Sequence, residues 1–255
     1  MIECGSLEFA DARVHARHGQ RLDEPTWRRI ETMREFAPML ELARRTALRP
    51  WLVGVTADSS VHQIEATLRG HWQALVDEAA AWTAAPWQPA VVWCAVLPDL
   101  GPLQHLARHG EPVAWMRREA AWRELCAAPA AARAALLGAG PLAPLARAWS
   151  EPASIGQAWL AEWTRRLPLP IDRAGVALGQ LVRVLLAHGR AFGDAAPGQG
   201  GLLRGALRAR MAVLLRRAAL EPAAVFVHIV LCALDLERLR GELLRRSAFA
   251  RWRVH

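Results

Sequence analysis

Apolar residues recur at intervals of three and four positions along most of this chain, which is the spacing of one face of an α-helix. The clearest stripe runs from Ser60 to the loop Thr83–Pro86 and contains Val61, Ile64, Leu68, Trp72, Leu75, Ala79 and Trp82. Ser60 and Gln63 form a capping-box pattern, which predicts a helix beginning directly after Ser60. No segment shows the sustained alternation of a strand. The sequence therefore predicts an all-α fold.

The last third of the sequence predicts three further helices. We expect them over about Ile171–Phe192, Leu202–Ala219 and Glu221–Arg246, with the glycine-rich loop Gly193–Gly201 between the first two. The apolar stripe of the final helix is Phe226, Ile229, Val230, Ala233, Leu236, Leu239 and Leu243. Glu242 and Arg246 stand four residues apart in the orientation that stabilises a helix, so we expect them to pair.

Prolines and glycines divide the earlier sequence into shorter helices. In the first part of the chain we expect helices over Leu7–Gln20, from the cap Asp23, and from Pro38 to Thr46. Further on, helices are expected over Trp87–Leu97, from Pro98 to His109, and from Pro112 through Leu125. Short helical pieces are expected between Pro129 and Trp149, and a further helix begins at Ser150. Gly110 is expected to end the helix that contains His109. The segment Pro168-Leu169-Pro170 is the best candidate for a linker.

The composition is that of a globular helical protein. Hydrophobic residues make up 53% and charged residues 22% of the 255 positions, which excludes a disordered chain. Tyrosine is absent, whereas tryptophan occurs twelve times, largely on the predicted helical stripes. We expect these tryptophans to fill the space between helices, with nucleobase stacking or a partner hot spot as the alternatives.

The net charge of +8 comes from arginine alone, because the chain has no lysine. Lysine-dependent chemistry, such as Schiff-base formation or a P-loop lysine, is thereby excluded. Residues 201–255 carry eleven arginines against four acids, a net charge of +7, so the first 200 residues are nearly neutral. Such a basic segment indicates an acidic partner, an anionic membrane surface or nucleic acid, unless the arginines serve solubility alone.

The cysteines and the apolar runs bear on cellular location. Cys4, Cys94, Cys126 and Cys232 are widely spaced without a CxxC pair, so we expect buried thiols in a reducing cytoplasm. Met1–Cys4 has no basic segment followed by an apolar one, and no signal peptide is expected. The longest apolar run, Ala223–Leu234, is shorter than the roughly 20 residues of a membrane span. We therefore expect a chain that does not cross a bilayer.

Candidate catalytic patterns are sparse. His105 and His109 have a spacing that can place two imidazoles on one metal ion, but no glutamate follows the first. We therefore expect ordinary surface histidines here, and likewise for His15 and His18. Gly198–Gly201 precedes a helix whose N-terminus could bind an anion, but no strand precedes it and the phosphate-binding glycine patterns are absent, so we expect a plain loop between helices. None of the six serines lies in a GxSxG pattern. We expect no enzyme activity, no cofactor and no metal.

Asp235 interrupts the final predicted helix directly after its apolar run. A buried carboxylate at this position needs a cationic partner, and Arg238, three residues on, could supply one. The alternative to a polar pocket or interface is a solvated helix flank. The sequence leaves both open.

Three segments resemble one known family. The stretch Phe226–Gly241 is similar to the last helix of the central-stalk subunit of V-type (or archaeal A-type) rotary ATPases, which is called C in prokaryotes and d in eukaryotes. Asp235 matches the acid of that helix, Leu236 its aliphatic residue, and Leu239-Arg240 its Leu-Arg pair. His62–Arg69 resembles the family's Ile-Glu-x-x-Leu helix, and Ala12–Arg17 resembles its Ala-Arg-Val-Arg-Ala opening helix. At Trp93-Cys94-Ala95 the chain lacks the acid of the family's Trp-Asp-Val segment.

This resemblance implies a fold and a role. The fold would be three related helical subdomains, here about 1–85, 86–167 and 168–255, arranged as a funnel around a pseudo-threefold axis. The role would be a non-catalytic coupling subunit of a membrane rotary ATPase, which links the rotor shaft to the membrane rotor ring for ion or proton transport. The chain would be peripheral, at the cytoplasmic face of the membrane. Candidate partner-contact or polar-socket residues are Asp235, Glu237, Arg238, Arg240, Arg204 and Arg208.

The basic C-terminal third supports a different expectation, a helical nucleic-acid-binding or regulatory scaffold module. Its arginines are mixed with acids on amphipathic helices, and no compact recognition helix stands out. We therefore expect the coupling subunit and no nucleic-acid partner.

Overall fold

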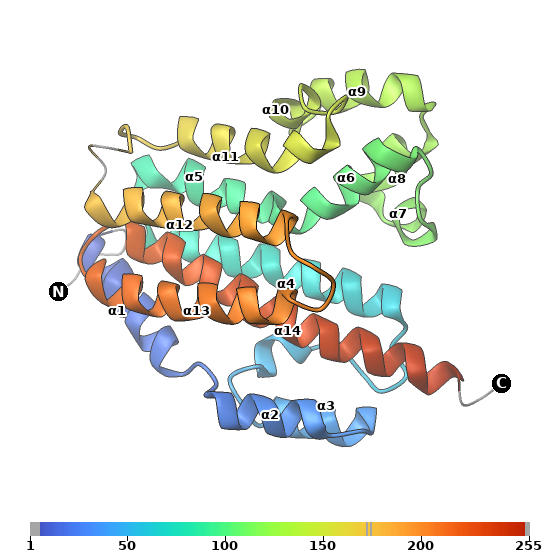
Figure 1. The fold of residues 1–255 in the computed structure, drawn as a ribbon, viewed down its shortest axis with the longest axis horizontal. Coiled ribbons are helices and arrows are strands. Elements are labelled where there is room, and N and C mark those ends of the chain that lie inside the picture. The colour runs from blue at the N-terminus through green and yellow to red at the C-terminus, as the bar shows by residue number, and fades with distance from the viewer. Residues whose placement is uncertain (1–5, 172, 174, 253–255) are drawn as a thin grey trace. The chain divides into compact units, whose positions relative to one another are not determined.

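The computed structural model of the chain describes residues 6–171, 173 and 175–252, and every regular element in these residues is helical (Figure 1). The predicted all-α class is thus confirmed. None of the described helices is both long and apolar enough to span a bilayer. The expectations for Met1–Cys4 lie outside the described residues.

The chain divides into two compact units, of which the larger combines residues 1–91 with 168–255. Its elements are α1 (Leu7–Gly19), α2 (Glu24–Thr32), α3 (Phe36–Arg44), the 3-10 turn η1 (Arg49–Leu52), α4 (Val61–Trp82), η2 (Ala85–Trp87), α12 (Val176–Gly193), α13 (Gly200–Arg217) and α14 (Ala223–Trp252). The division into three subdomains stays a prediction.

The smaller unit covers residues 92–167, and α5 (Gln88–Trp93) leads into it. Its further elements are η3 (Cys94–Asp99), α6 (Leu100–His109), α7 (Ala114–Arg118), α8 (Ala120–Ala127), α9 (Ala130–Ala139), α10 (Ala143–Ala146), η4 (Pro152–Ser154) and α11 (Ile155–Arg165). Buried Arg133 donates to the carbonyl oxygens of Leu125 and Ala128, where it satisfies the free end of α8.

The central element of the larger unit is α14. It packs against α4 and α13 most extensively, and also against α1, α3 and α12 (Figure 1). The first turns of α14, from Ala223 to Ile229, are buried at every position. A helix that is apolar on all sides is stable only when other helices enclose it, so this segment anchors the core of the unit.

The predicted helix starts are confirmed where a side chain caps the helix. Ser60 and Gln63 form the complete capping box of α4, and Asp23 accepts a hydrogen bond from the Thr26 amide at the start of α2. Gly110 ends α6 in the left-handed conformation, with φ of 71°. The buried stripe of α4 differs slightly from the predicted one, since Val76 is buried whereas Val61 and Leu75 are only partly covered.

Two expected helices are divided. The helix predicted over Trp87–Leu97 is divided among η2, α5 and η3. Pro98 lies inside η3 and has no amide hydrogen to donate to the turn before it, so the last part is not a regular α-helix. The helix predicted from Pro112 through Leu125 consists of α7 and α8, and the backbone between them is extended at Glu119. The helix predicted from Pro38 begins two residues earlier, at Phe36.

Many of the tryptophans fill space between helices, as expected. The buried ones include Trp27, Trp51, Trp72, Trp82, Trp87, Trp93, Trp122, Trp159 and Trp163. In the smaller unit, the Trp93 and Trp159 indole nitrogens each donate to the backbone carbonyl of the other residue, at 3.1 and 3.3 Å. The paired hydrogen bonds hold α5 and α11 together.

Candidate functional site

Asp235 is buried in the larger unit, with 8% of its surface exposed, and it lies between two arginines. The Arg21 Nε atom donates to its Oδ2 at 2.7 Å, and Arg208 pairs with its Oδ1. Arg21 also donates to the backbone carbonyl of Leu231 at 3.1 Å. Because the two guanidinium groups come from the end of α1 and from α13, Asp235 ties three separate chain segments together.

Arg238 does not provide the local partner considered for Asp235. Its guanidinium binds both Glu24 carboxylate oxygens at 2.8 Å and donates to Glu31 at 2.6 Å. It also lies 4.7 Å from the ring centre of Trp27, which adds a cation–π contact. Hydrogen bonding from Arg238 lowers the pKa of Glu24. Arg238 therefore ties α14 to α2.

Arg240 connects α14 to α4. Its Nε atom donates to both carboxylate oxygens of Glu65 at 2.8 and 2.9 Å, and its Nη2 donates to Glu65 at 2.5 Å. Glu237 is exposed and lies 3.7 Å from Arg240. Asp235, Arg238 and Arg240, together with Arg21, Arg208, Glu24, Glu31 and Glu65, are called the α14 ion-pair network below.

The structure thus brings most of the predicted site residues together and leaves one apart. Asp235, Arg238, Arg240 and Arg208 belong to the α14 ion-pair network, and Glu237 lies at its edge. Arg204 instead stacks on Phe192, with its guanidinium carbon 5.7 Å from the ring centre.

A buried arginine on α14, Arg246, donates hydrogen bonds to the end of α2. Arg246 is 4% exposed and donates to the carbonyl oxygens of Ile30, Glu31 and Met33, at 3.1, 3.0 and 2.5 Å. These carbonyls lie at the C-terminal end of α2, where the backbone supplies few donors: the Met33 amide donates to Ile30, and Arg246 supplies the donors for Glu31 and Met33. Arg246 also pairs with Glu242, which confirms the predicted pair.

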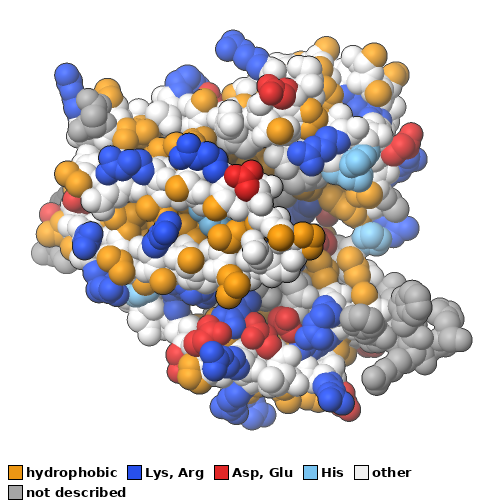
Figure 2. All heavy atoms as spheres, viewed as in Figure 1, with side chains coloured by type: hydrophobic (Ala, Val, Ile, Leu, Met, Phe, Trp, Pro, Cys, Tyr) orange, Lys and Arg blue, Asp and Glu red, His pale blue; other side chains and the backbone are white. Residues whose placement is uncertain are grey.

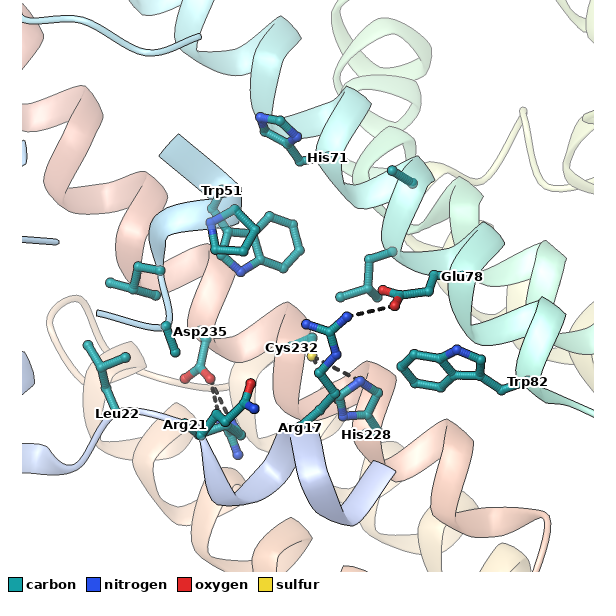
Figure 3. A pocket seen from close by; sticks show the side chains of 16 residues that line it. Arg17, Arg21, Leu22, Trp51, His71, Glu78, Trp82, His228, Cys232 and Asp235 are labelled. Atoms are coloured by element: carbon teal, nitrogen blue, oxygen red, sulfur yellow. Dashed lines mark hydrogen bonds and ion pairs between the residues drawn. The ribbon is translucent and has the colours of Figure 1, made fainter. Parts of the chain in front are cut away.

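A cavity of about 220 Å³ adjoins the network (Figure 3). Arg21 and Asp235 form one part of its wall, and Arg17 forms another, where it pairs with Glu78 at 2.6 Å. The indole rings of Trp51 and Trp82 also line it. Each ion pair joins one arginine to one carboxylate, so the charged lining of the cavity carries no net charge.

His228 and Cys232 line the same cavity on consecutive turns of α14, with Cys232 Sγ 3.6 Å from His228 Nε2. Burial, reinforced by Arg21 and Arg17, lowers the pKa of His228 to about 4, so its imidazole is neutral at physiological pH. Burial raises the pKa of Cys232 to about 12, and it does the same for Cys94.

The depressed pKa of His228 makes stability depend on pH. Below pH 6.5, the ordinary pKa of a histidine, the imidazole of residue 228 binds a proton in the unfolded chain. In the folded chain it does not bind this proton until about pH 4. We therefore expect the free energy of unfolding to fall by about 2 kcal/mol between about pH 7 and about pH 5. Denaturant titrations at both pH values test this, and a His228→Gln variant that falls equally would contradict it.

The raised thiol pKa values predict slow alkylation. With a pKa of about 12 instead of 9.0, Cys94 and Cys232 have about a thousandfold less thiolate at neutral pH. Iodoacetamide labelling, followed by mass spectrometry, should modify Cys126 in the folded protein well before Cys94 or Cys232. Equal labelling of all three thiols before the addition of guanidinium chloride would contradict the raised pKa values of Cys94 and Cys232.

The histidines considered as metal ligands lie together on α6, where the rings of His105 and His109 are 4.8 Å apart, centre to centre. Among the described residues, no group of three or more His, Cys, Asp or Glu side chains is placed to bind a metal. The loop that contains Gly198 ends at α13, and Arg204 folds back over Phe192 there.

Sequence reasoning missed the partners of Asp235. Arg21 lies 214 positions away from Asp235, and no local spacing connects the two. The same holds for Arg238 with Glu31, 207 positions apart. A useful signal was the unusual position of an acid after an apolar run, which indicates that a distant cation is needed when the helix is buried.

The fold and the site together define an all-α protein in which buried or half-buried ion pairs hold α14 to α2, α4 and α13 and to the turn that follows α1. Comparison of the sequence with models of protein families, with curated proteins and with solved structures finds no match.

Proposed function

We propose that this chain is the central-stalk socket subunit of a V-type or A-type rotary ATPase. In this role it links the rotor shaft to the membrane rotor ring and transmits torque, without a catalytic centre of its own. It is a peripheral subunit at the cytoplasmic face of the membrane, and the complex it serves transports protons or other ions.

The observation that carries this proposal is the convergence of the three segments that resemble the family. Ala12–Arg17 lies on α1, His62–Arg69 on α4 and Phe226–Gly241 on α14, and these three helices pack against one another. Glu65 of the second segment binds Arg240 of the third, although 175 positions separate them. One residue of the second segment thus contacts one residue of the third directly.

The proposed role requires mechanical stiffness, and ion pairs of this kind supply it. A part that passes torque must not shear between its helices, and directional hydrogen bonds between charged groups hold a fixed register better than apolar packing alone. In the larger unit, α14 is fixed to α1 and α13 through Asp235, to α2 through Arg238 and to α4 through Arg240. We infer that these contacts keep the socket rigid under load.

The funnel is the finer part of the proposal. Three subdomains of about 1–85, 86–167 and 168–255 would surround a pseudo-threefold axis, with the shaft in the cavity between them and the ring below. Asp235, Glu237, Arg238, Arg240, Arg204 and Arg208 would stabilise or line the polar socket. Cysteine cross-linking from exposed Glu237 to the shaft subunits tests this placement.

Co-purification tests the proposed function directly. A tagged chain, isolated from mildly solubilised membranes of the cells that produce it, should bring with it the catalytic head and the membrane ring of a rotary ATPase. The chain should also show no DNA binding in low-salt buffer, which separates this function from a nucleic-acid-binding module. A chain that stays monomeric beside a fully assembled ATPase would rule the proposal out.

A further inference from the structure

The helical hairpin α12–α13 carries a charge that the rest of the larger unit does not neutralise. Residues 176–217 contain seven arginines and a single acid, Asp194, which gives a net charge of +6. One of these arginines, Arg208, pairs with Asp235. The exposed arginines Arg183, Arg190, Arg210, Arg216 and Arg217 make no ion pair with any described residue. This face therefore has a strong attraction for an anionic partner.

The same hairpin exposes apolar side chains between its arginines. Val176, Leu186, Phe192, Leu202 and Val213 are between 40% and 79% exposed. In Figure 2, hydrophobic and basic side chains alternate over α12 and α13, and acidic side chains are sparse there. An exposed surface that is both apolar and basic is typical of an interaction site rather than of a face that only keeps the chain soluble.

A groove between the two helices has a volume of about 360 Å³. Val184 of α12 and Ala209, Val213 and Leu214 of α13 form its apolar lining. Arg210 and Arg217 border it, seven residues apart on α13. Seven residues are two turns of a helix, so the two guanidinium groups are anchored about 10 Å apart along one side of the groove.

We propose that this groove binds an acidic amphipathic helix of a partner protein. The apolar face of such a helix would cover Val184, Val213 and Leu214, and carboxylates two turns apart would pair with Arg210 and Arg217. A concave apolar groove with charges on one border fits a helix, whereas a lipid surface is flat and would engage all the exposed arginines alike. This inference concerns a binding surface and does not depend on the proposed function.

Peptide binding tests the inference. The probe is a fluorescent peptide of about 18 residues with leucines on one face and glutamates seven apart beside them, long enough to form a helix in the groove. A second peptide has the same composition in scrambled order. We expect the ordered peptide to bind at least about tenfold more tightly than the scrambled one, because only it can bury leucines and pair both arginines together.

Matched charge reversals locate the site. Arg210→Glu/Arg217→Glu should weaken binding of the ordered peptide at least about tenfold, whereas Arg183→Glu/Arg190→Glu, with the same change in charge outside the groove, should change it by less than about twofold. Circular dichroism must show that both variants stay folded. Equal losses in the two variants, or no preference for the ordered peptide, would overturn the inference.

Anionic vesicles test whether this face binds a membrane surface and not a partner helix. Vesicles of phosphatidylglycerol and phosphatidylcholine should not compete with the ordered peptide at the ionic strength of a cell. If these vesicles bind the chain and displace the peptide, and both double variants weaken the vesicle binding alike, the face serves a membrane surface and the inference is wrong.

Discussion

Replacing Asp235 by asparagine is expected to lower the free energy of unfolding by about 3 kcal/mol, because it removes the only carboxylate that Arg21 and Arg208 pair with among the described residues. The two guanidinium side chains are 14% and 23% exposed, so water cannot fully replace the lost partner. Asparagine keeps the shape of the side chain, but it removes the charge and replaces one of the two acceptor oxygens by an NH2 group that cannot accept from an arginine. Urea or guanidinium denaturation of the purified variant measures the effect.

The control for this variant lies two residues further along the same helix. Glu237 is exposed and only 3.7 Å from Arg240, so Glu237→Gln should change the free energy of unfolding by less than about 0.5 kcal/mol. A chain in which both substitutions have equal and small effects would show that Asp235 is solvated in the folded state.

Replacing Arg246 by methionine is expected to cost a similar amount, about 3 kcal/mol of unfolding free energy. Methionine keeps an unbranched stem in the buried site, so little cavity forms. It cannot donate hydrogen bonds, however, so the carbonyl oxygens of Glu31 and Met33 lose the Arg246 donor, and Ile30 keeps only its bond from the Met33 amide. The same denaturation experiment, with hydrogen exchange at the end of α2, reports the loss.

The adjacent arginine provides the comparison. Arg245 pairs with the same Glu242 carboxylate at 2.8 Å but is half-exposed, so Arg245→Met should cost less than about 0.5 kcal/mol. If Arg246→Met is as mild as Arg245→Met, or leaves hydrogen exchange in α2 unchanged, the buried cap does not stabilise the helix.

The sequence predicted the helices well where a local signal exists. The capping box at Ser60 fixed the start of α4, and Gly110 fixed the end of α6, because both act within a few residues. The final helix is longer than predicted, since it continues from Ala223 to Trp252 without a breaking residue. Near Val227 and His228 this helix is buried on all sides, because several helices enclose it. The single apolar stripe predicted from the sequence does not describe such burial.

The candidate site was predictable only in part. Asp235 drew attention as a charge directly after an apolar run, but a residue's neighbours in a folded chain depend on the packing of distant helices. Arg21 and Arg208 became its partners through the placement of α1 and α13, which no spacing in the sequence encodes. Arg246 was expected to pair with Glu242, and its larger role at the end of α2 follows from tertiary contacts alone.

We propose that this chain couples the rotor shaft to the membrane ring of a rotary ATPase. ATP-driven membrane potential in inverted vesicles, followed with a voltage-sensitive dye, tests it most directly. In vesicles from cells that lack the chain, ATP hydrolysis by the catalytic head should continue while the potential is lost, and adding back the purified chain should restore it. An undiminished ATP-driven potential in the absence of the chain would contradict the claim.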